Sequence, residues 1–396
     1  MKAETMKAET PTSYEEAAEL LRAAATDGQP VRFRGGGTKL GWGRAVPEPD
    51  LEICTQGLDA VLEHNAGDFT AVLQAGVPLA VAQNTFAEAG QMLALDPPLS
   101  PWGGAGDDAA IEAADAGATI GGIVATNDAG PLRHRYGGVR DLVVGVTVVL
   151  SDGTIARAGG KVIKNVAGYD LGKLFAGAFG TLGLIAEITV RLHPRPARTA
   201  TVVARSEDPA ELSGAAAALT HAPLEADCID LWWDGYAGAG AVLARFGSAD
   251  PGPRVDETAA LLGKFGGLAV ETDDDDEPCW EAQRRAQRGD VVVKVSALPT
   301  ALPVAIAATR ELGGTLVARA GLGLAWIQLE PTVAAIEELR QKLAPAPCVV
   351  LDAPTELRAA LDPWSAATGP IDLMGKVKAR FDPAGICAPG LFVGGI

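Results

Sequence analysis

Cysteine, histidine and aromatic residues are scarce in this sequence of 396 residues. The five cysteines (Cys54, Cys228, Cys279, Cys348, Cys387) are scattered and form no Cys-x-x-Cys pair, which argues against an iron–sulfur cluster or a structural zinc site within the chain. No apolar run reaches the roughly 18 residues of a membrane-spanning helix. The apolar run 142–150 is far shorter, and we expect a buried strand there.

Positive charge is also in short supply. Lys and Arg number 33 against 50 Asp and Glu, so the formal net charge is −17. Such a charge disfavours nucleic acids and anionic membranes as primary partners. A hydrophobic fraction of 48% with 21% charged residues is typical of globular proteins, and the length suffices for two or three domains. We expect a cytoplasmic protein without direct membrane insertion, associated with a membrane only through its partners.

Residues 1–10 repeat Met-Lys-Ala-Glu-Thr twice, and we expect this duplicated leader to be disordered and outside the fold. The chain then shows alternating strand and helix signals up to Pro194 and Pro196, which mark a domain boundary. Ser13, with Glu16 three residues later, is typical of a helix start. The expected elements are helices at 13–25 and 78–89 and strands at 31–34, 51–55, 71–75, 142–150, 154–158 and 184–192.

Two successive strand–helix–strand–strand–helix units follow between residues 201 and 343. This order predicts a mixed domain with an antiparallel sheet covered by helices on one face. The acidic run 273–277 is expected to be a loop between the units, and a last helix is expected at 364–381. The fold class is therefore α+β, with expected domains at 11–195 and 196–362 and a C-terminal segment at 363–396 that returns to the first domain.

A glycine-rich segment at residues 32–43 is the first that carries chemistry. Glycines allow positive φ angles and bring several backbone N–H groups close to one anion, as a diphosphate requires. Arg34, Thr38 and Lys39 can add hydrogen bonds and charge. The spacing matches neither G-x-G-x-x-G nor the Walker P-loop. An ordinary glycine-rich turn remains the alternative.

Two further segments are rich in small residues, as the segment 32–43 is. Residues 117–127, followed by 133–137, leave room for a planar ligand against the backbone and offer polar contacts from Thr119, Thr126 and Asn127. Residues 159–170, continuing to 180–185, form the most specific segment of the three. Between them lies an acidic, proline-rich segment at 96–117, which we expect to be a solvated loop or short helix sensitive to proteases.

These three segments, in this order before a proline-marked boundary, resemble the FAD-binding domain of the vanillyl-alcohol oxidase and p-cresol methylhydroxylase superfamily. Within it, the chain is most similar to the E subunits of bacterial glycolate oxidases. The resemblance rests on residues 160–170 with Gly180-Thr-Leu-Gly183, on Gln91-Met-Leu with Pro97-Pro98, and on the closing residues 382–390.

The resemblance implies a two-subdomain FAD-binding domain and a cap over the substrate side of the flavin. It places a pyrophosphate loop at 34–43, flavin and ribityl contacts at 119–130, and adenine contacts at 180–185. Gly37 stands where covalent members carry histidine, so the FAD is expected to be non-covalent. Ala388-Pro389-Gly390 replaces the family's Asn-Pro-Gly, and the His-rich metal motif of related dehydrogenases is absent, so no catalytic metal is inferred. The implied cofactor contacts are Arg34, Gly35, Gly36, Gly37, Thr38, Lys39, Leu40, Trp42, Pro98, Thr119, Gly121, Gly122, Val124, Thr126, Asn127, Gly130, Gly180, Gly183, Leu184 and Ile185.

Catalytic residues are not identified by the sequence. Oxidation of a 2-hydroxy acid needs a base for the hydroxyl and a cation for the carboxylate. Arg319, Lys294 and Arg245 on expected cap strands are candidate cations, although strand-edge surface cations are the simpler interpretation. His134 is a candidate base or a solvated loop residue. Trp232 and Trp233 are adjacent, so one of them should be core.

Three functions remain open. The first is an FAD-bearing subunit of a complex that oxidises glycolate or another small 2-hydroxy acid, together with a larger flavoprotein subunit and an iron–sulfur subunit. The second is a stand-alone FAD-dependent oxidase or dehydrogenase acting on an alcohol or hydroxy acid. The third is a flavin-bound scaffold without catalysis.

Overall fold

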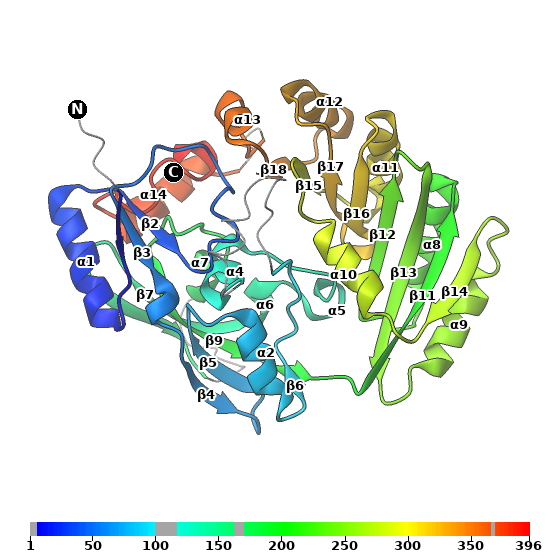
Figure 1. The fold of residues 1–396 in the computed structure, drawn as a ribbon, viewed down its shortest axis with the longest axis horizontal. Coiled ribbons are helices and arrows are strands. Elements are labelled where there is room, and N and C mark those ends of the chain that lie inside the picture. The colour runs from blue at the N-terminus through cyan, green and yellow to red at the C-terminus, as the bar shows by residue number, and fades with distance from the viewer. Residues whose placement is uncertain (1–5, 100–116, 162–169, 366–368) are drawn as a thin grey trace.

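The computed structural model describes residues 6–99, 117–161, 170–365 and 369–396, and its fold is α+β. Two lobes lie side by side in Figure 1, with the N-terminal half of the chain in one and a large sheet in the other. Helix α14 lies in the first lobe, so the chain returns there after the large sheet. Among the described residues, no helix is long and apolar enough to cross a membrane.

The first lobe begins with a three-stranded parallel sheet and one long helix. Ser13 starts α1 because its Oγ accepts a hydrogen bond from the Glu16 N–H at 3.1 Å, and Gly28 ends it at φ 67°. Ala17, Leu21 and Ala24 share the buried face of the helix, which packs on the sheet in one core. The elements are β1 (Lys7–Glu9), β3 (Leu51–Cys54) and β2 (Val31–Arg34), in that spatial order, with α1 (Tyr14–Asp27).

A five-stranded antiparallel sheet forms the second layer of this lobe, in the order β4-β5-β9-β7-β8. Its central strand β9 is buried along most of its length, which explains its apolar sequence. The strands are β4 (Val61–Asn65), β5 (Thr70–Gln74), β9 (Leu184–Arg191), β7 (Val143–Val149) and β8 (Ile155–Gly159). The connecting elements are α2 (Leu79–Ala87), β6 (Gln91–Met92), α4 (Ile120–Thr126), α5 (Arg133–Tyr136), α6 (Val139–Leu142), α7 (Gly172–Phe175) and β10 (His193–Pro194).

The second lobe, which we call the cap, is an eight-stranded antiparallel sheet. Its order, β14-β11-β13-β12-β16-β17-β15-β18, joins two similar halves through β12 and β16. The strands are β11 (Arg198–Ser206), β12 (Cys228–Asp234), β13 (Ala239–Ser248), β14 (Ala269–Asp273), β15 (Val292–Ser296), β16 (Thr315–Arg319), β17 (Leu324–Gln328) and β18 (Cys348–Asp352). The helices are α8 (Pro209–His221), α9 (Gly252–Leu262), α10 (Glu277–Arg285), α11 (Leu302–Glu311) and α12 (Val333–Leu343).

The two faces of the cap sheet have different neighbours. Helices α8, α9, α11 and α12 cover one face and form the main core with it, as the sequence predicted. Trp233 belongs to this core and is 1% exposed, whereas its neighbour Trp232 points to the other face. That second face contacts α10 through Trp280 and contacts the first lobe through Trp42.

Several expectations from the sequence are corrected. Lys7–Glu9 of the supposed leader pairs in register with β3, so the leader is part of the fold from there. The acidic run 273–277 is not a simple loop, because it closes β14 and opens α10. Strands β4 and β18 and helix α13 (Thr355–Ala360) were not predicted, and the last helix, α14 (Ile371–Phe381), begins later than expected. Most of 96–117 and of the 159–170 motif lies outside the described residues.

Candidate cofactor site

A cavity of about 620 Å³ lies where the glycine-rich loop after β2 meets α4 and the turn before β9. This volume falls within the range of small-molecule and cofactor sites. Its walls come from all three glycine-rich regions and from segments near the C-terminus. The predicted contacts that line it are Gly35, Gly36, Gly37, Thr38, Lys39, Leu40, Trp42, Thr119, Gly122, Thr126 and Gly180.

Backbone donors in the loop 35–37 are left without partners. The N–H groups of Gly35, Gly36 and Gly37 make no hydrogen bond to any residue that the structure describes. Buried or half-buried backbone amides in proteins are almost always paired, so a run of free donors facing a cavity is suited to an anion. Gly37 has φ 75°, a conformation that disfavours side chains.

Gly35 and Gly36 are also required by packing. A Cβ atom at Gly36 would lie 1.7 Å from the carbonyl oxygen of Gly117, and one at Gly35 would lie 2.1 Å from Thr119 Oγ1. The loop after β2 therefore rests directly on the chain that leads into α4. Two of the predicted segments are in contact for this reason.

Helix α4 is held by its own small residues. Thr119 caps its start by accepting from the Gly122 N–H at 3.3 Å. Gly121 faces away from the cavity, since a Cβ there would lie 2.6 Å from the Ala75 Cβ. Asn127 ends the helix at φ 50°, and its buried Oδ1 has no hydrogen-bond partner in the described structure.

The remaining predicted contacts do not line this cavity. Arg34 instead forms an ion pair with Glu52, its Nε lying 2.8 Å from Oε1. Gly130 packs on Asp96, and Gly183 on the carbonyl of Val149. The set that lies outside the lining is Arg34, Pro98, Gly121, Val124, Asn127, Gly130, Gly183, Leu184 and Ile185.

Sequence reasoning missed several lining residues. The stretch 44–49 after the glycine-rich loop, Thr355 and Arg358 of α13, and the turn 388–391 all reach the cavity. The closing 382–390 motif was the one available signal, because its resemblance implied a return to the first domain. Ala388 adopts φ 45°, and its N–H donates to the Val31 carbonyl at 2.9 Å, which places the turn beside β2.

The loop beside the cavity is attached to the last cap strand. Asp352 accepts a hydrogen bond from Trp42 Nε1 at 2.8 Å and pairs with Arg288, whose Nε lies at 2.7 Å. Arg288 also donates to the Thr38 carbonyl at 3.1 Å. Both charged side chains are less than 10% exposed. One buried network thus holds the cap against the glycine-rich loop.

Comparison with known proteins indicates the cofactor of this domain. A family model described as "FAD binding domain" matches residues 8–107 and 109–159. The chain carries an FAD-binding domain of the p-cresol methylhydroxylase type. FAD is therefore the cofactor, and the cavity is its candidate site.

Relatives of this domain are enzymes or enzyme subunits. Glycolate oxidase subunit GlcE of Escherichia coli (strain K12) is 35% identical over 179 residues, which is 45% of this chain and 46% of the relative. D-lactate dehydrogenase of Archaeoglobus fulgidus is 34% identical over 194 residues, 49% of this chain and 40% of the relative. D-2-hydroxyglutarate dehydrogenase of Xanthomonas citri pv. viticola is 33% identical over 186 residues, 47% and 36%. The matched region spans less than half of each of these relatives.

A solved structure extends the likeness of fold to nearly the whole chain. An alkyldihydroxyacetonephosphate synthase superposes with a TM-score of 0.68 over 96% of this chain and 75% of its own, at 16% identity. This similarity concerns the fold alone.

The residues present fit FAD. The free amides at 35–37 suit phosphate oxygens, and Arg358 Nε is a buried polar atom of the lining that has no hydrogen-bond partner among the described residues. Lys39 lines the cavity, where burial lowers its pKa while Asp128, 3.2 Å away, opposes that effect. Among the described residues, no group of three or more His, Cys, Asp or Glu is placed to hold a metal ion.

The candidate cations of the cap have different environments. Arg319 is fully buried, its NH1 2.6 Å from Asp230 Oδ2, and Arg245 pairs with Asp276 at 2.8 Å. Neither is a strand-edge surface cation, and each is neutralised by the protein itself. Lys294 has no ion pair with any described residue, and its Nζ lies 5.6 Å from the centre of the Trp326 ring. Trp326 shares a cluster with Trp42, so Lys294 lies on the cap face that meets the FAD-binding domain.

Burial shifts the titration of several groups near this boundary. It lowers the pKa of Lys294, with Arg133 and Arg319 lowering it further against the attraction of Asp128. It also lowers the pKa of His134, assisted by Arg135, so the imidazole is neutral at pH 7. His134 Nδ1 is buried without a hydrogen-bond partner among the described residues, and the ring lies against Gly321 of the cap. Burial raises the pKa of Asp96 to about 6.

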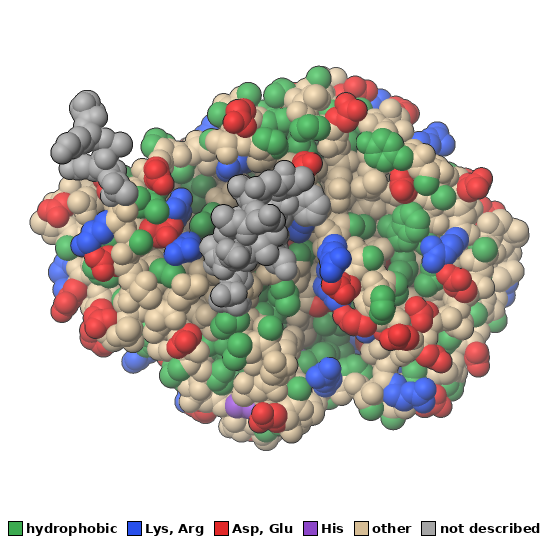
Figure 2. All heavy atoms as spheres, viewed as in Figure 1, with side chains coloured by type: hydrophobic (Ala, Val, Ile, Leu, Met, Phe, Trp, Pro, Cys, Tyr) green, Lys and Arg blue, Asp and Glu red, His purple; other side chains and the backbone are tan. Residues whose placement is uncertain are grey.

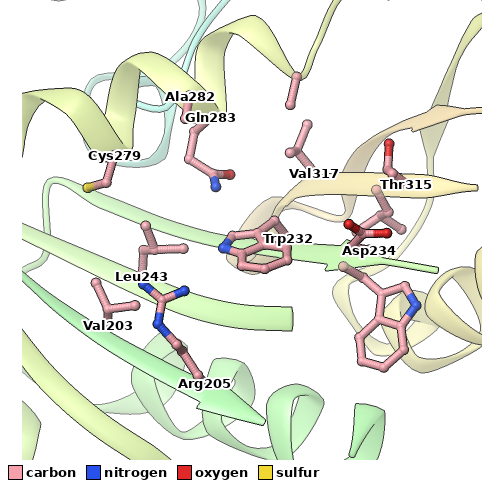
Figure 3. A pocket seen from close by; sticks show the side chains of 13 residues that line it. Val203, Arg205, Trp232, Asp234, Leu243, Cys279, Ala282, Gln283, Thr315 and Val317 are labelled. Atoms are coloured by element: carbon pink, nitrogen blue, oxygen red, sulfur yellow. The ribbon is translucent and has the colours of Figure 1, made fainter. Parts of the chain in front are cut away.

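A second cavity, of about 400 Å³, lies wholly in the cap between α10 and the sheet. Trp232 and Leu243 form its floor, and Gln283 enters from α10 above them (Figure 3). None of its lining residues lines the cavity beside the glycine-rich loop. On the face of the molecule in Figure 2, acidic and basic side chains are interspersed, so the net charge of −17 is not concentrated in one acidic patch there.

Proposed function

We propose that this protein is an FAD-dependent oxidoreductase that takes part in oxidising glycolate or another small 2-hydroxy acid and passes electrons to partner subunits. The observation that carries the proposal is Lys294, a partly buried cation that forms no ion pair with a described residue, on the cap face that meets the FAD-binding domain. The printed activities of several relatives, on glycolate, D-lactate and D-2-hydroxyglutarate, support the substrate class.

Lys294 and Arg133 together suit a small carboxylate. Arg133 lies on α5 of the FAD-binding domain and, like Lys294, has no ion pair with a described residue. Burial lowers the pKa of Arg133, and the charge of Arg319 lowers it further, against the attraction of Asp141. Two desolvated cations that repel each other gain when an anion binds between them. FAD, when bound, supplies the hydride acceptor for the substrate carbon.

The subunit role rests on similarity to glycolate oxidase subunit GlcE, and a larger flavoprotein and an iron–sulfur protein are the proposed partners. A stand-alone oxidase or dehydrogenase is the alternative. An anaerobic titration of the purified yellow protein with glycolate, D-lactate and D-2-hydroxyglutarate distinguishes the subunit role from the stand-alone enzyme. Bleaching by the isolated chain supports the alternative, and bleaching only after co-expression with neighbouring gene products supports the subunit role.

The same titration tests the carboxylate site. Lys294→Met should raise the substrate concentration for half-bleaching about 10- to 100-fold, because a charge-assisted hydrogen bond contributes about 1.5–3 kcal/mol. Lys264→Met is the matched control, since Lys264 is exposed beyond α9. The FAD content of both variants should equal that of the unaltered protein. If the flavin of Lys294→Met is half-bleached at the same substrate concentration as that of the control, Lys294 does not bind the substrate carboxylate.

A further inference from the structure

The cap supplies part of the wall of the FAD cavity. Helix α13 follows β18 directly, its Leu357 packs in the main core of the cap, and its residues Thr355 and Arg358 line the cavity. No motif in the sequence and no predicted contact pointed to this helix. Asp352, at the end of β18, is the residue that binds Trp42 and Arg288, so the position of α13 depends on the docked cap.

Arg358 differs from the other cations that line the cavity. Its Nε is buried without a hydrogen-bond partner in the part of the chain that the structure describes, and its only hydrogen bond there is a long one, NH2 to Thr355 Oγ1 at 3.5 Å. No carboxylate of a described residue lies within ion-pair distance of it. The other cations are each paired already: Arg32 with Glu52 at 2.6 Å, Lys39 with Asp128 at 3.2 Å and Arg44 with Asp362 at 3.4 Å.

An unpaired guanidinium at the wall of a cavity favours the binding of an anion there. Burial lowers the pKa of Arg358, while the more distant Asp352 opposes that effect, so the guanidinium is desolvated without a close counter-charge. The phosphates of a dinucleotide are the anions this cavity would hold, and the free amides of Gly35, Gly36 and Gly37 are neutral dipoles that bind but do not neutralise them. A guanidinium is well suited to phosphate oxygens because its planar donors can contact two at once.

We propose that Arg358 of α13 binds the phosphates of FAD and is the cation by which the cap holds the cofactor. The inference rests on the FAD-binding domain and not on the proposed substrate. It follows that cofactor affinity depends on a residue outside the domain that the family model matches. Bound FAD should in turn strengthen the docking of the cap, because linkage between two binding events is reciprocal.

The test is a titration of FAD, ADP and riboflavin into the full-length protein after removal of its flavin, followed by fluorescence at several salt concentrations. Arg358→Met should weaken FAD and ADP by a similar factor, about 10- to 100-fold, and leave riboflavin unchanged, since riboflavin lacks phosphate. The FAD affinity of this variant should depend less on salt concentration, because it lacks the ion pair between Arg358 and the phosphates, which salt screens. Arg358→Lys should recover part of the loss.

Arg310→Met provides the matched control, because Arg310 is exposed on α11. It should bind all three ligands as the unaltered protein does. FAD affinity within twofold of the unaltered protein in Arg358→Met would overturn the proposal. So would an equal loss for riboflavin, which would indicate a deformed cavity. A rise in the substrate concentration for flavin bleaching with unchanged FAD affinity would assign Arg358 to substrate and also overturn it.

Discussion

Replacing Asp352 with Asn should weaken the docking of the cap on the FAD-binding domain. Asp352 is 8% exposed and accepts three hydrogen bonds, one from Trp42 and two from Arg288 at 2.7 and 3.0 Å. The substitution preserves shape but leaves Arg288, also buried, with no counter-charge. Removing one member of a buried ion pair typically costs about 3–5 kcal/mol, much of it from the charge left behind.

The expected loss is large enough to measure by calorimetry. For a cooperative unit of 150–250 residues, about 2–4 °C of Tm is lost for each kcal/mol, so Asp352→Asn should lower the first transition by on the order of 10 °C. Glu271→Gln is the control, because Glu271 pairs with Arg205 at 2.9 Å where both side chains are more than half exposed. An exposed pair contributes at most about 1 kcal/mol.

A second variant separates charge from shape. Arg288→Met combined with Asp352→Asn should recover part of the lost stability, since no unpaired charge remains and the amide oxygen can still accept from Trp42. The reasoning is refuted if Asp352→Asn shifts the transition no further than Glu271→Gln does. It is also refuted if the double variant is less stable than Asp352→Asn alone.

Two other perturbations give expected results. Gly36→Ala should abolish FAD binding and lower stability by more than about 2 kcal/mol, because its Cβ would lie 1.7 Å from the Gly117 carbonyl oxygen. Gly41→Ala is the control and should be tolerated, because there is open space around Gly41. FAD titration and thermal melting measure both effects. Burial raises the pKa of Asp96 to about 6. The native state therefore binds more protons than the unfolded chain between about pH 4 and 6. The free energy of unfolding should fall there by up to about 1.4 kcal/mol per pH unit as the pH rises. Denaturation of Asp96→Asn across this range should show a flatter profile, and an equal slope would contradict the assignment.

The sequence was sufficient for much of the fold because the signals are local. The strand 31–34 and the helix that begins after Ser13 follow from periodicity and capping, and the structure confirms both. The two repeated units of the cap were visible for the same reason. Strand β18 and the pair β14 and α10 were missed, since β14 is short and partly exposed and α10 opens within an acidic run that reads as solvated.

The sequence by itself determined that a glycine-rich loop with exposed backbone donors would follow the strand 31–34, because that property belongs to the loop's own residue types, and it predicted an anion as their partner. It did not determine which cations would meet the anion. Arg34 is committed to Glu52 and Arg319 to Asp230, and these partners are set by strand pairing. Arg358 lines the cavity, and the nearby Asp352 docks this part of the cap onto Trp42, across 310 residues of sequence. Charge pairing across such distances depends on tertiary contacts, so only the folded structure assigns these side chains.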